Sequence, residues 1–501
     1  MRPGAVRLRP DVTSSTAAPI SRSSVGLRSD RGPILASVML SVALVAIDTT
    51  ILATAVPAIV DDLGGFTQFP WLFSTYLLAQ AVTTPIYGKL ADVFGRKPLM
   101  LLGIGLFVLG SVLCAVAWSM TALIVFRAVQ GLGAGAIQPA SVTIMGDIYS
   151  VAERAVAQSY VAGVWATAAV VGPTLGGIFS EQLSWRWIFW INVPLGALAA
   201  YVLARRFHES AAHEARSERR PLDLGGAVLL ALAAGLVLLG LLEGGIRWAW
   251  WSPVGVGIFA AALVLLLAFV AVERRVPDPV LPLWVFRDRV LNAATIGSFV
   301  VGMVMLGVTS YVPVYAQRVL GAGAVTAGLA VAALAIGWPI AASSAGRFYL
   351  RLGFRPCLLA GALFGVLGTG IVLLVGPGSP VWLLALGCLV LGLGLGYVAS
   401  PSIVAAQSAV AWRHRGVATG TNMFARSVGS AVGVAVFGAV ANGVVAARLG
   451  GHRAGDVDLD ALPIDVLEPA LHAVFAGVAL AALALVVAGL VMPKRFEPVA
   501  D

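Results

Sequence analysis

Two ionisable side chains lie in the middle of long apolar stretches of this chain. Asp48 lies within IDTTIL and Arg127 within FRAVQG. A charged group is costly in hydrocarbon and marks a functional site by default. Loss of water favours the protonated form of a carboxyl group, which suits Asp48 to proton binding, whereas a guanidinium group such as that of Arg127 stays charged and needs a partner.

Each of these residues has an alternative interpretation. Asp48 could be a carboxylate that a structural ion pair keeps permanently ionised. Arg127 could adjust the proton affinity of Asp48 or of another acid, or it could hydrogen-bond the backbone of neighbouring helices. Arg426 lies in a later apolar stretch, and the same interpretations apply to it as to Arg127. Asp147 and Glu243 fall near the ends of apolar stretches, where we expect solvated roles.

The composition predicts that membrane-spanning helices hold these residues. The hydrophobic fraction is 59% and the charged fraction 11%, against roughly 45–50% and about 25% in soluble domains. About fourteen stretches are long enough to cross a hydrocarbon core, which takes roughly 20 helical residues. They are Leu35 to Ile59, Phe69 to Tyr87, Pro98 to Trp118, Thr121 to Ile144, Ala155 to Phe179, Trp187 to Leu203, Leu224 to Leu242, Val254 to Val272, Leu291 to Tyr315, Val325 to Ala345, Pro356 to Val375, Val381 to Pro401, Val417 to Val440 and Leu471 to Val491.

Basic residues gather in alternate loops, which predicts the orientation of the spans. One set of loops holds Lys89, Arg96, Lys97, Arg154, Arg205, Arg206, Arg216, Arg219, Arg220, Arg274, Arg275, Arg287, Arg289, Arg347, Arg351, Arg355, Arg413 and Arg415. The other set holds only Arg186, Arg247, Arg318, Arg448 and Arg453. We therefore expect the first set and both termini in the cytoplasm. This asymmetry accounts for the net charge of +9, so no nucleic-acid partner is inferred.

Several other chemistries find no support in the sequence. The three cysteines lie in or beside spans, and the histidines lack ligand spacing, so no metal site is expected. The glycines of GLGAG at 131–135, and Gly392, Gly394 and Gly396, lie within apolar helices, where small residues let helices approach closely. No phosphate-binding loop is present. We expect no cofactor and no catalytic residue, and an ion gradient or a partner must drive any uphill transport.

The motifs together resemble the major facilitator superfamily, and in particular its fourteen-span drug:proton antiporter branch. The loop GKLADVFGRKP resembles the superfamily signature in Gly88, Asp92, Gly95, Arg96 and Lys97, while Val93 departs from it. The block Arg127, Gln130, Gly131, Gly133 and Gly135 resembles the proton-transfer motif. The block Gly172, Pro173, Gly176 and Gly177 resembles the antiporter motif. Asp48, Thr49, Thr50, Ile51 and Pro57, with SWRWIFWINVPLG at 184–196, are typical of the branch.

This resemblance implies an all-α polytopic fold of two six-helix bundles with two inserted spans. The implied layout is a disordered cytoplasmic tail at 1–32, an N-terminal bundle at 33–207, two additional spans with linkers at 208–290, a C-terminal bundle at 291–493 and a cytoplasmic tail at 494–501. Gly346, Arg347, Gly353 and Arg355 resemble a degenerate copy of the loop signature, consistent with internal duplication.

A proton-coupled antiporter that exports lipophilic drugs or hydrophobic metabolites is the function the resemblance implies. Asp48 and Arg127 would couple protons. Polar or aromatic residues within apolar spans are cavity candidates: Tyr76, Gln80, Gln130, Trp165, Gln317, Trp338, Gln407, Asn422, Phe424 and Arg426. Helix packing or interfacial anchoring is the alternative for each.

Other functions and partners remain open at this stage. The alternatives are export of basic amino acids or lipid-like molecules, and a transporter-like receptor that moves nothing. We expect a monomer in the bacterial inner membrane, working with a small substrate, protons and the lipid bilayer. The acidic exterior loop 441–469 could meet an envelope partner or simply cap the cavity.

Overall fold

The computed structural model describes residues 25–64, 68, 70–207, 223–244, 247–276, 279, 281–448 and 463–494, and long helices dominate them. The helices are α2 (Gly32–Leu63), α3 (Pro70–Phe94), α4 (Arg96–Ala115), α5 (Met120–Ile148), α6 (Val151–Gln182), α7 (Trp187–Trp190), α8 (Asn192–Arg206), α10 (Leu224–Glu243), α11 (Pro253–Glu273), α12 (Arg289–Arg318), α13 (Ala324–Leu352), α14 (Phe354–Leu373), α15 (Val381–Ser408), α16 (Arg415–Arg448) and α17 (Ile464–Val491). Short 3₁₀ turns η2 (Leu283–Phe286) and η3 (Trp412–His414) precede α12 and α16.

Each predicted span overlaps one of these helices, and the all-α membrane fold is confirmed. Within the described residues, twelve helices are long and apolar enough to cross a membrane. The helix α3 is not among the twelve, and α10 contributes only the shorter apolar stretch Gly225–Leu241. The figure of about fourteen spans therefore stays a prediction.

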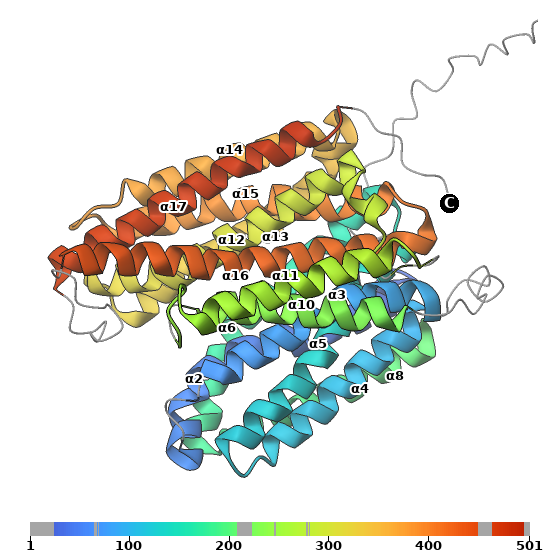
Figure 1. Cartoon of the computed structure of the whole chain (residues 1–501), viewed down its shortest axis with the longest axis horizontal. Coiled ribbons are helices and arrows are strands. Elements are labelled where there is room, and N and C mark those ends of the chain that lie inside the picture. The colour runs from blue at the N-terminus through green and yellow to red at the C-terminus, as the bar shows by residue number, and fades with distance from the viewer. Residues whose placement is uncertain are drawn as a thin grey trace, which may run out of the picture.

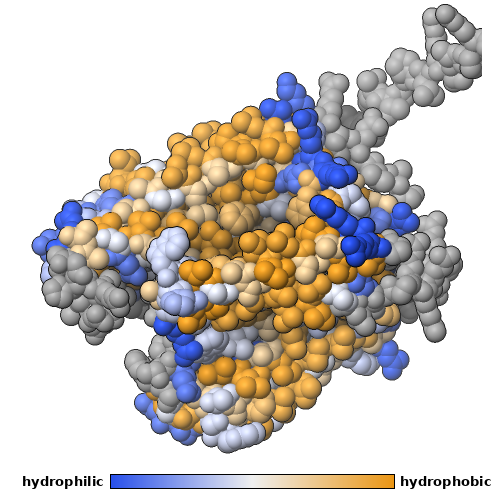
Figure 2. All heavy atoms as spheres, in the orientation of Figure 1, coloured by the Kyte–Doolittle hydropathy of each residue, from blue (hydrophilic) through white to orange (hydrophobic). Residues whose placement is uncertain are grey.

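The helices form two bundles (Figure 1). Phe107 and Ile137 belong to an apolar cluster built mainly by α2 to α8, which also takes in Ala345 of the second bundle. Leu391 and Phe475 belong to a cluster built by α12 to α17. Figure 2 shows hydrophobic residues along the middle of the long axis and hydrophilic residues gathered at its two ends. This distribution is that of a protein embedded in a bilayer, with its helices crossing the apolar band.

The inserted pair α10 and α11 lies against the line where the two bundles meet (Figure 1). Helix α10 contacts both α3 of the first bundle and α16 of the second, while α11 packs on α10. Ala81, Leu238 and Ala431 form a small apolar cluster at this junction. The insertion therefore covers one of the two seams between the bundles.

Glycines set the closest helix contacts, as the sequence predicts. A Cβ atom at Gly131 or Gly133 would meet the backbone of Tyr76 or Phe107, and one at Gly392 would meet the backbone of Leu334. The bundles also share a turn geometry that fits internal duplication. Gly95 between α3 and α4 has φ +98°, and Gly353 between α13 and α14 has φ +92°, values that glycine adopts without steric cost.

Two segment boundaries differ from those expected. The described part of the predicted tail, residues 25–31, packs on the first bundle: Val25 is buried, and Arg31 forms an ion pair with Glu153 at 2.7 Å. Residues 1–24 and 495–501 lie outside the described part. The expected exterior loop 441–469 is shorter, because α16 continues to Arg448 and α17 begins at Ile464 after Pro463. Residues 449–462 lie outside the description.

Replacing Gly429 by alanine should destabilise the C-terminal bundle. A Cβ atom there would collide with the carbonyl oxygen of Phe299 on α12, whereas nothing lies within 4 Å of a Cβ at Gly443 on the same helix. Overpacking costs about 1–3 kcal/mol. We expect a melting temperature several degrees lower for Gly429→Ala, measured with a thiol-reactive dye that reports exposure of the buried Cys114, Cys357 and Cys388.

The control for this experiment is Gly443→Ala, which removes only the helix penalty of glycine, about 1 kcal/mol. Its melting temperature should stay the same or rise. Equal melting temperatures for the two variants would contradict the close packing of α12 and α16.

Candidate functional site

Asp48 and Arg127 form an ion pair inside the N-terminal bundle. An Nη of Arg127 on α5 lies 2.6 Å from an Oδ of Asp48 on α2, and each side chain is only 1% exposed. The two residues are far apart in the sequence, and the packing of α2 and α5 brings them together. A buried pair holds together only when further hydrogen bonds satisfy both charges.

Neutral polar groups supply these additional hydrogen bonds. Gln130 donates to the second carboxylate oxygen of Asp48 at 2.7 Å and accepts from Arg127 at 2.6 Å. Its amide also donates to Ser111 on α4 at 2.8 Å. Asn192, at the start of α8, donates to Ser111 at 3.2 Å and faces Asp48 at 3.4 Å. Its own carboxamide oxygen is buried without a partner.

Arg127 also contacts α3. Its Nε donates to the carbonyl oxygen of Leu72 at 3.2 Å, and its guanidinium carbon lies 4.2 Å from the ring centre of Tyr76. Arg127 thus bonds the backbone of a neighbouring helix and also pairs with Asp48, while its effect on the proton affinity of Asp48 stays a prediction. We call Asp48, Arg127, Gln130, Ser111 and Asn192 the polar network. Sequence reasoning missed Ser111 and Asn192 as site residues.

A second site lies where the bundles meet, and Asp92 is at its centre. Asp92, in the last turns of α3, accepts hydrogen bonds from the backbone N–H groups of Gly416 and Val417, both at 2.9 Å. These N–H groups open α16 of the other bundle. A carboxylate at a helix N-terminus satisfies free donors and interacts favourably with the helix dipole. Asp92 is thus a helix cap supplied by the opposite bundle.

Arg96 and Asp147 extend this contact into a charged cluster. Arg96 pairs with Asp92 at 3.0 Å and with Asp147 at 3.1 Å, and it donates to the carbonyl oxygen of Trp412 while lying over its ring. Asp147 also faces Arg415 at 3.5 Å. We call Asp92, Arg96, Asp147 and Arg415 the gate cluster.

The solvated roles expected for Asp147 and Glu243 are wrong. The side chains are 12% and 7% exposed. Asp147 turns inward because the arginines at the bundle junction compensate its charge. Glu243 lies near Arg247, at a loose 3.8 Å, one turn further along the chain.

The remaining signature residues set backbone contacts. Gly88 lies against the carbonyl of Gly416, so the bundles touch through their backbones. Gly95 provides the turn described above, and Lys97 donates to the carbonyl oxygen of Ala204 at 2.8 Å. These contacts place the loop signature at the junction of the bundles.

The antiporter block lies on α6, which packs against α2. Cβ atoms at Gly172 and Gly176 would collide with Thr50 and Thr54, whereas nothing lies within 4 Å of one at Gly177. The backbone of Pro173 is helical, and its side chain lies outside the described part. Two of these glycines therefore serve close packing on α2 within two turns of Asp48.

The structure disperses the cavity candidates. Tyr76 and Gln130 belong to or touch the polar network. Asn422 is satisfied within its own bundle by Ser298 and the carbonyl of Ala294. Gln407 bonds Thr419 of its own bundle and, across the junction, the carbonyl of Val142.

Among the described residues, the other candidates make no such side-chain hydrogen bonds. Gln317 is exposed at the end of α12. Gln80, Trp165 and Phe424 are half-buried. Arg426 lies 5.9 Å from the ring centre of Trp338.

Two largely apolar hollows lie outside the polar network. One, of about 670 Å³, lies between α2, α6 and α13, on the seam opposite α10; it includes Ile47, Gly163 and Pro339. We call it the seam groove.

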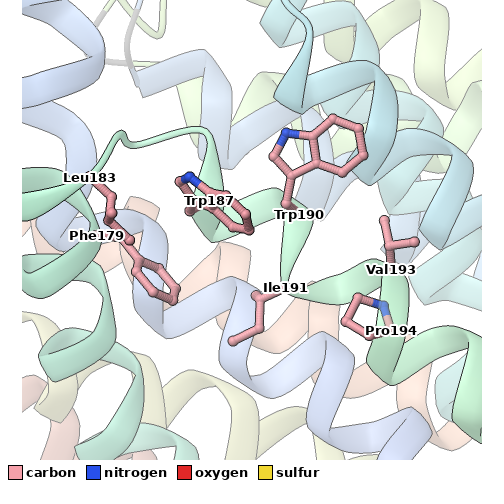
Figure 3. A pocket seen from close by; sticks show the side chains of 7 residues that line it. All are labelled: Phe179, Leu183, Trp187, Trp190, Ile191, Val193 and Pro194. Carbon is pink, nitrogen blue, oxygen red and sulfur yellow. The ribbon is translucent and has the colours of Figure 1, made fainter.

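The other hollow, of about 700 Å³, lies where α6, α7 and α8 meet. It is lined by Phe179, Leu183, Trp187, Trp190, Ile191, Val193 and Pro194. Figure 3 shows this second hollow, with the two tryptophan rings on one side of it.

An ion pair fixes the end of α2 opposite the gate cluster. Arg186 binds the carboxylate of Asp62 at 2.6 Å, and the indole N–H of Trp185 donates to it at 3.0 Å. The Arg186 guanidinium first, and the Trp185 indole second, hold the pKa of Asp62 below its ordinary value. These hydrogen bonds give SWRW, at residues 184–187, a structural role.

The family follows from a sequence comparison. A family model described as Major Facilitator Superfamily matches residues 38–225 and 222–434. The chain belongs to the major facilitator superfamily. It is therefore a membrane transporter for small molecules.

Named relatives and solved structures agree with this assignment. Multidrug resistance protein 3 of Bacillus subtilis (strain 168) is 34% identical over 417 residues, covering 83% of this chain and 80% of the relative. Efflux pump dotC of Dothistroma septosporum (strain NZE10 / CBS 128990) is 32% identical, covering 80% and 70%.

Two solved structures share the fold at 15% identity. The human organic anion transporter MFSD10 (TETRAN) has a TM-score of 0.64 and covers 91% of this chain and 99% of its own. The proton:xylose symporter XylE has a TM-score of 0.60 and covers 90% and 94%. At this identity the likeness concerns the fold.

Removing the cap at Asp92 should loosen the junction between the bundles. Loss of a helix cap costs about 1 kcal/mol, or roughly fivefold in an equilibrium. Thr84 is 4% exposed on α3, beside Gly420 of α16, and can report opening as Thr84→Cys. In that background, Asp92→Ala should raise the rate of labelling by a water-soluble maleimide about fivefold.

Asp61→Ala is the matched control, because it removes an exposed carboxylate at the far end of α2. Its labelling rate should equal that of the parent. An unchanged rate in Asp92→Ala would show that the cap does not hold the junction closed.

Proposed function

We propose that this transporter is a proton-coupled antiporter of the fourteen-span drug:proton branch, exporting lipophilic small molecules from the cytoplasm. The buried Asp48–Arg127 pair is the observation that carries the proposal. The names of the relatives, a multidrug resistance protein and an efflux pump, support export as the direction.

The polar network provides partners for both protonation states of Asp48. When ionised, Asp48 binds Arg127 and Gln130. When protonated, it must donate one hydrogen bond, and the unpartnered carboxamide oxygen of Asn192 can accept it after the amide rotates. Arg127 then keeps Gln130, the carbonyl of Leu72 and the ring of Tyr76. Arg127 therefore keeps these three contacts when Asp48 binds a proton, while its charge loses its counter-ion.

Opening and closing of the gate cluster would supply the second half of the transport cycle. The structure closes the bundles at the end that carries Asp92, Arg96 and Arg415, which the basic loops assign to the cytoplasm. In this state Asp48 would take a proton from the exterior. Opening the gate cluster would then expose the cavity to the cytoplasm, where substrate binds and the proton leaves.

The seam groove suits a lipophilic substrate. It is lined mainly by apolar side chains and reaches Ile47, the neighbour of Asp48 on α2. A molecule dissolved in the bilayer could enter between α6 and α13, because α10 and α11 cover only the other seam.

Asp48→Asn should abolish proton-driven accumulation of a lipophilic dye in proteoliposomes. The amide keeps the size of the side chain but cannot bind and release a proton. Exchange of substrate down its own gradient should continue, because the groove and the gate cluster are unchanged. The measurement is dye movement with and without an imposed pH gradient. Uphill transport by the variant would refute the proton site.

Reporter fusions should place both termini in the cytoplasm. Green fluorescent protein fused before Met1, after Asp501 or after Arg275 should fluoresce, and alkaline phosphatase should be active when fused after Arg247 or within residues 449–462. The alternating basic loops predict this pattern. Activity after Arg247 requires α10 to cross the membrane, whereas Arg275 is cytoplasmic whether both or neither of α10 and α11 span. An inactive phosphatase after Arg247 would contradict a fourteen-span layout.

A further inference from the structure

One cation in the apolar part of the second bundle lacks an opposite charge. Asp48 and Arg127 neutralise each other in the first bundle. Arg426 lies within α16, and among the described residues no hydrogen bond or ion pair reaches it. Its Nε is buried without a partner, although the side chain as a whole is half-buried. The rest of the side chain is therefore partly accessible.

Backbone packing fixes the place of Arg426. A Cβ atom at Gly302 on α12 would collide with the carbonyl oxygen of Arg426, so the two backbones touch there. Ser430, one turn further, donates to the carbonyl oxygen of Gly302 at 3.2 Å. The helix cannot rotate to turn Arg426 outward without losing these contacts.

The side chain of Arg426 extends toward Trp338 on α13, with 5.9 Å from the guanidinium carbon to the ring centre. The principal packing partners of α13 are α15 and α6, and those of α16 are α12 and α3. The Arg426–Trp338 contact therefore links the two helices that border opposite seams, across the middle of the protein. Figure 1 shows both helices in the C-terminal bundle, on the side facing the first bundle.

An arginine in this position requires an anion. Its guanidinium carries five N–H donors and does not lose its proton. An aromatic ring near 6 Å compensates only a small part of the cost of an unpaired charge. A carboxylate can accept two parallel hydrogen bonds from the same group, while an apolar body attached to it could lie against the ring of Trp338.

We propose that Arg426 and Trp338 bind an acidic group of the transported molecule, so that the preferred substrates are lipophilic carboxylates. This inference rests on the proposed function, because it names the substrate class of the same transporter. The two bundles then have different tasks. The polar network in the first bundle binds the proton, and Arg426 in the second bundle binds the charged group of the substrate.

Binding of a matched pair of probes tests the proposal. Dansyl-aminoundecanoate carries a free carboxylate, and its methyl ester has the same body with one added methyl group and no charge. Their affinities for the full-length protein in nanodiscs can be compared by energy transfer from tryptophan to the dansyl group. The wild type should bind the acid about tenfold to a hundredfold more tightly than the ester, the range expected of a charge-assisted hydrogen bond.

Arg426→Gln should reduce this preference to less than about threefold by weakening binding of the acid alone. Arg426→Lys should keep an intermediate preference, because it retains the charge without the bidentate fork; it also serves if the glutamine variant does not fold. Arg351→Gln, an exposed arginine on α13, is the control and should bind as the wild type does. Equal binding of acid and ester by the wild type, or an unchanged preference in Arg426→Gln, would overturn the inference.

Proton-driven transport separates this inference from the proposed function. If the wild type exports the ester, but not the acid, against its gradient in response to a pH gradient, the antiporter proposal stands and the anion site falls. If the acid preference depends on Arg426 but no substrate responds to the pH gradient, the anion site stands and proton coupling falls.

Discussion

The buried pair of Asp48 and Arg127 is the constraint on which the N-terminal bundle depends. Removing two charges from water costs several kcal/mol for each, and their attraction offsets this only when the remaining hydrogen-bonding groups are also satisfied. Gln130, Ser111, Asn192 and the carbonyl of Leu72 must therefore converge on the pair, and they come from α5, α4, α8 and α3. The helix arrangement that buries the pair is thus the one that completes its hydrogen bonds. Close packing at Gly131 and Gly133 lets α3 and α4 approach α5 near enough to do so.

The same helices carry the gate cluster, which gives a physical connection between the Asp48–Arg127 pair and the contact between the bundles. Helix α5 bears Arg127 and, some 30 Å further at 1.5 Å per residue, Asp147. Helix α3 bears Tyr76 and Asp92. A change in the contacts of Arg127 can therefore act on the gate through rigid elements, although Pro139 in α5 and Pro85 in α3 interrupt the helical hydrogen bonding on the way. The asparagine and glutamine of the network are neutral, so its only charges are those of Asp48 and Arg127.

The sequence was sufficient for the all-α membrane fold and for singling out Asp48 and Arg127, because a lone charge in an apolar stretch is conspicuous, but it left open whether the two residues pair with each other. The partners carried no such signal. Ser111 looks like any small residue in a span, and Asn192 lies in a run whose tryptophans suggest the membrane interface. Asp147 was misjudged since its position near a helix end suggested water, whereas burial there depends on arginines that only the tertiary structure brings close. The loop at 441–469 was overestimated because alanine, glycine and valine at the end of α16 continue a helix as readily as they fill a loop.

Helix α10 also affects how the two bundles are held together. It touches α3 and α16 together, so one seam is bridged and the opposite seam, between α6 and α13, has no such bridge among the described residues. The bundles are therefore joined through a third helix at one seam and by direct contact alone at the other, where Tyr349 donates to the carbonyl oxygen of Val151 at 2.7 Å. Lipid can reach the α6–α13 seam without crossing another helix, so the composition of the bilayer should influence the contact between the bundles there.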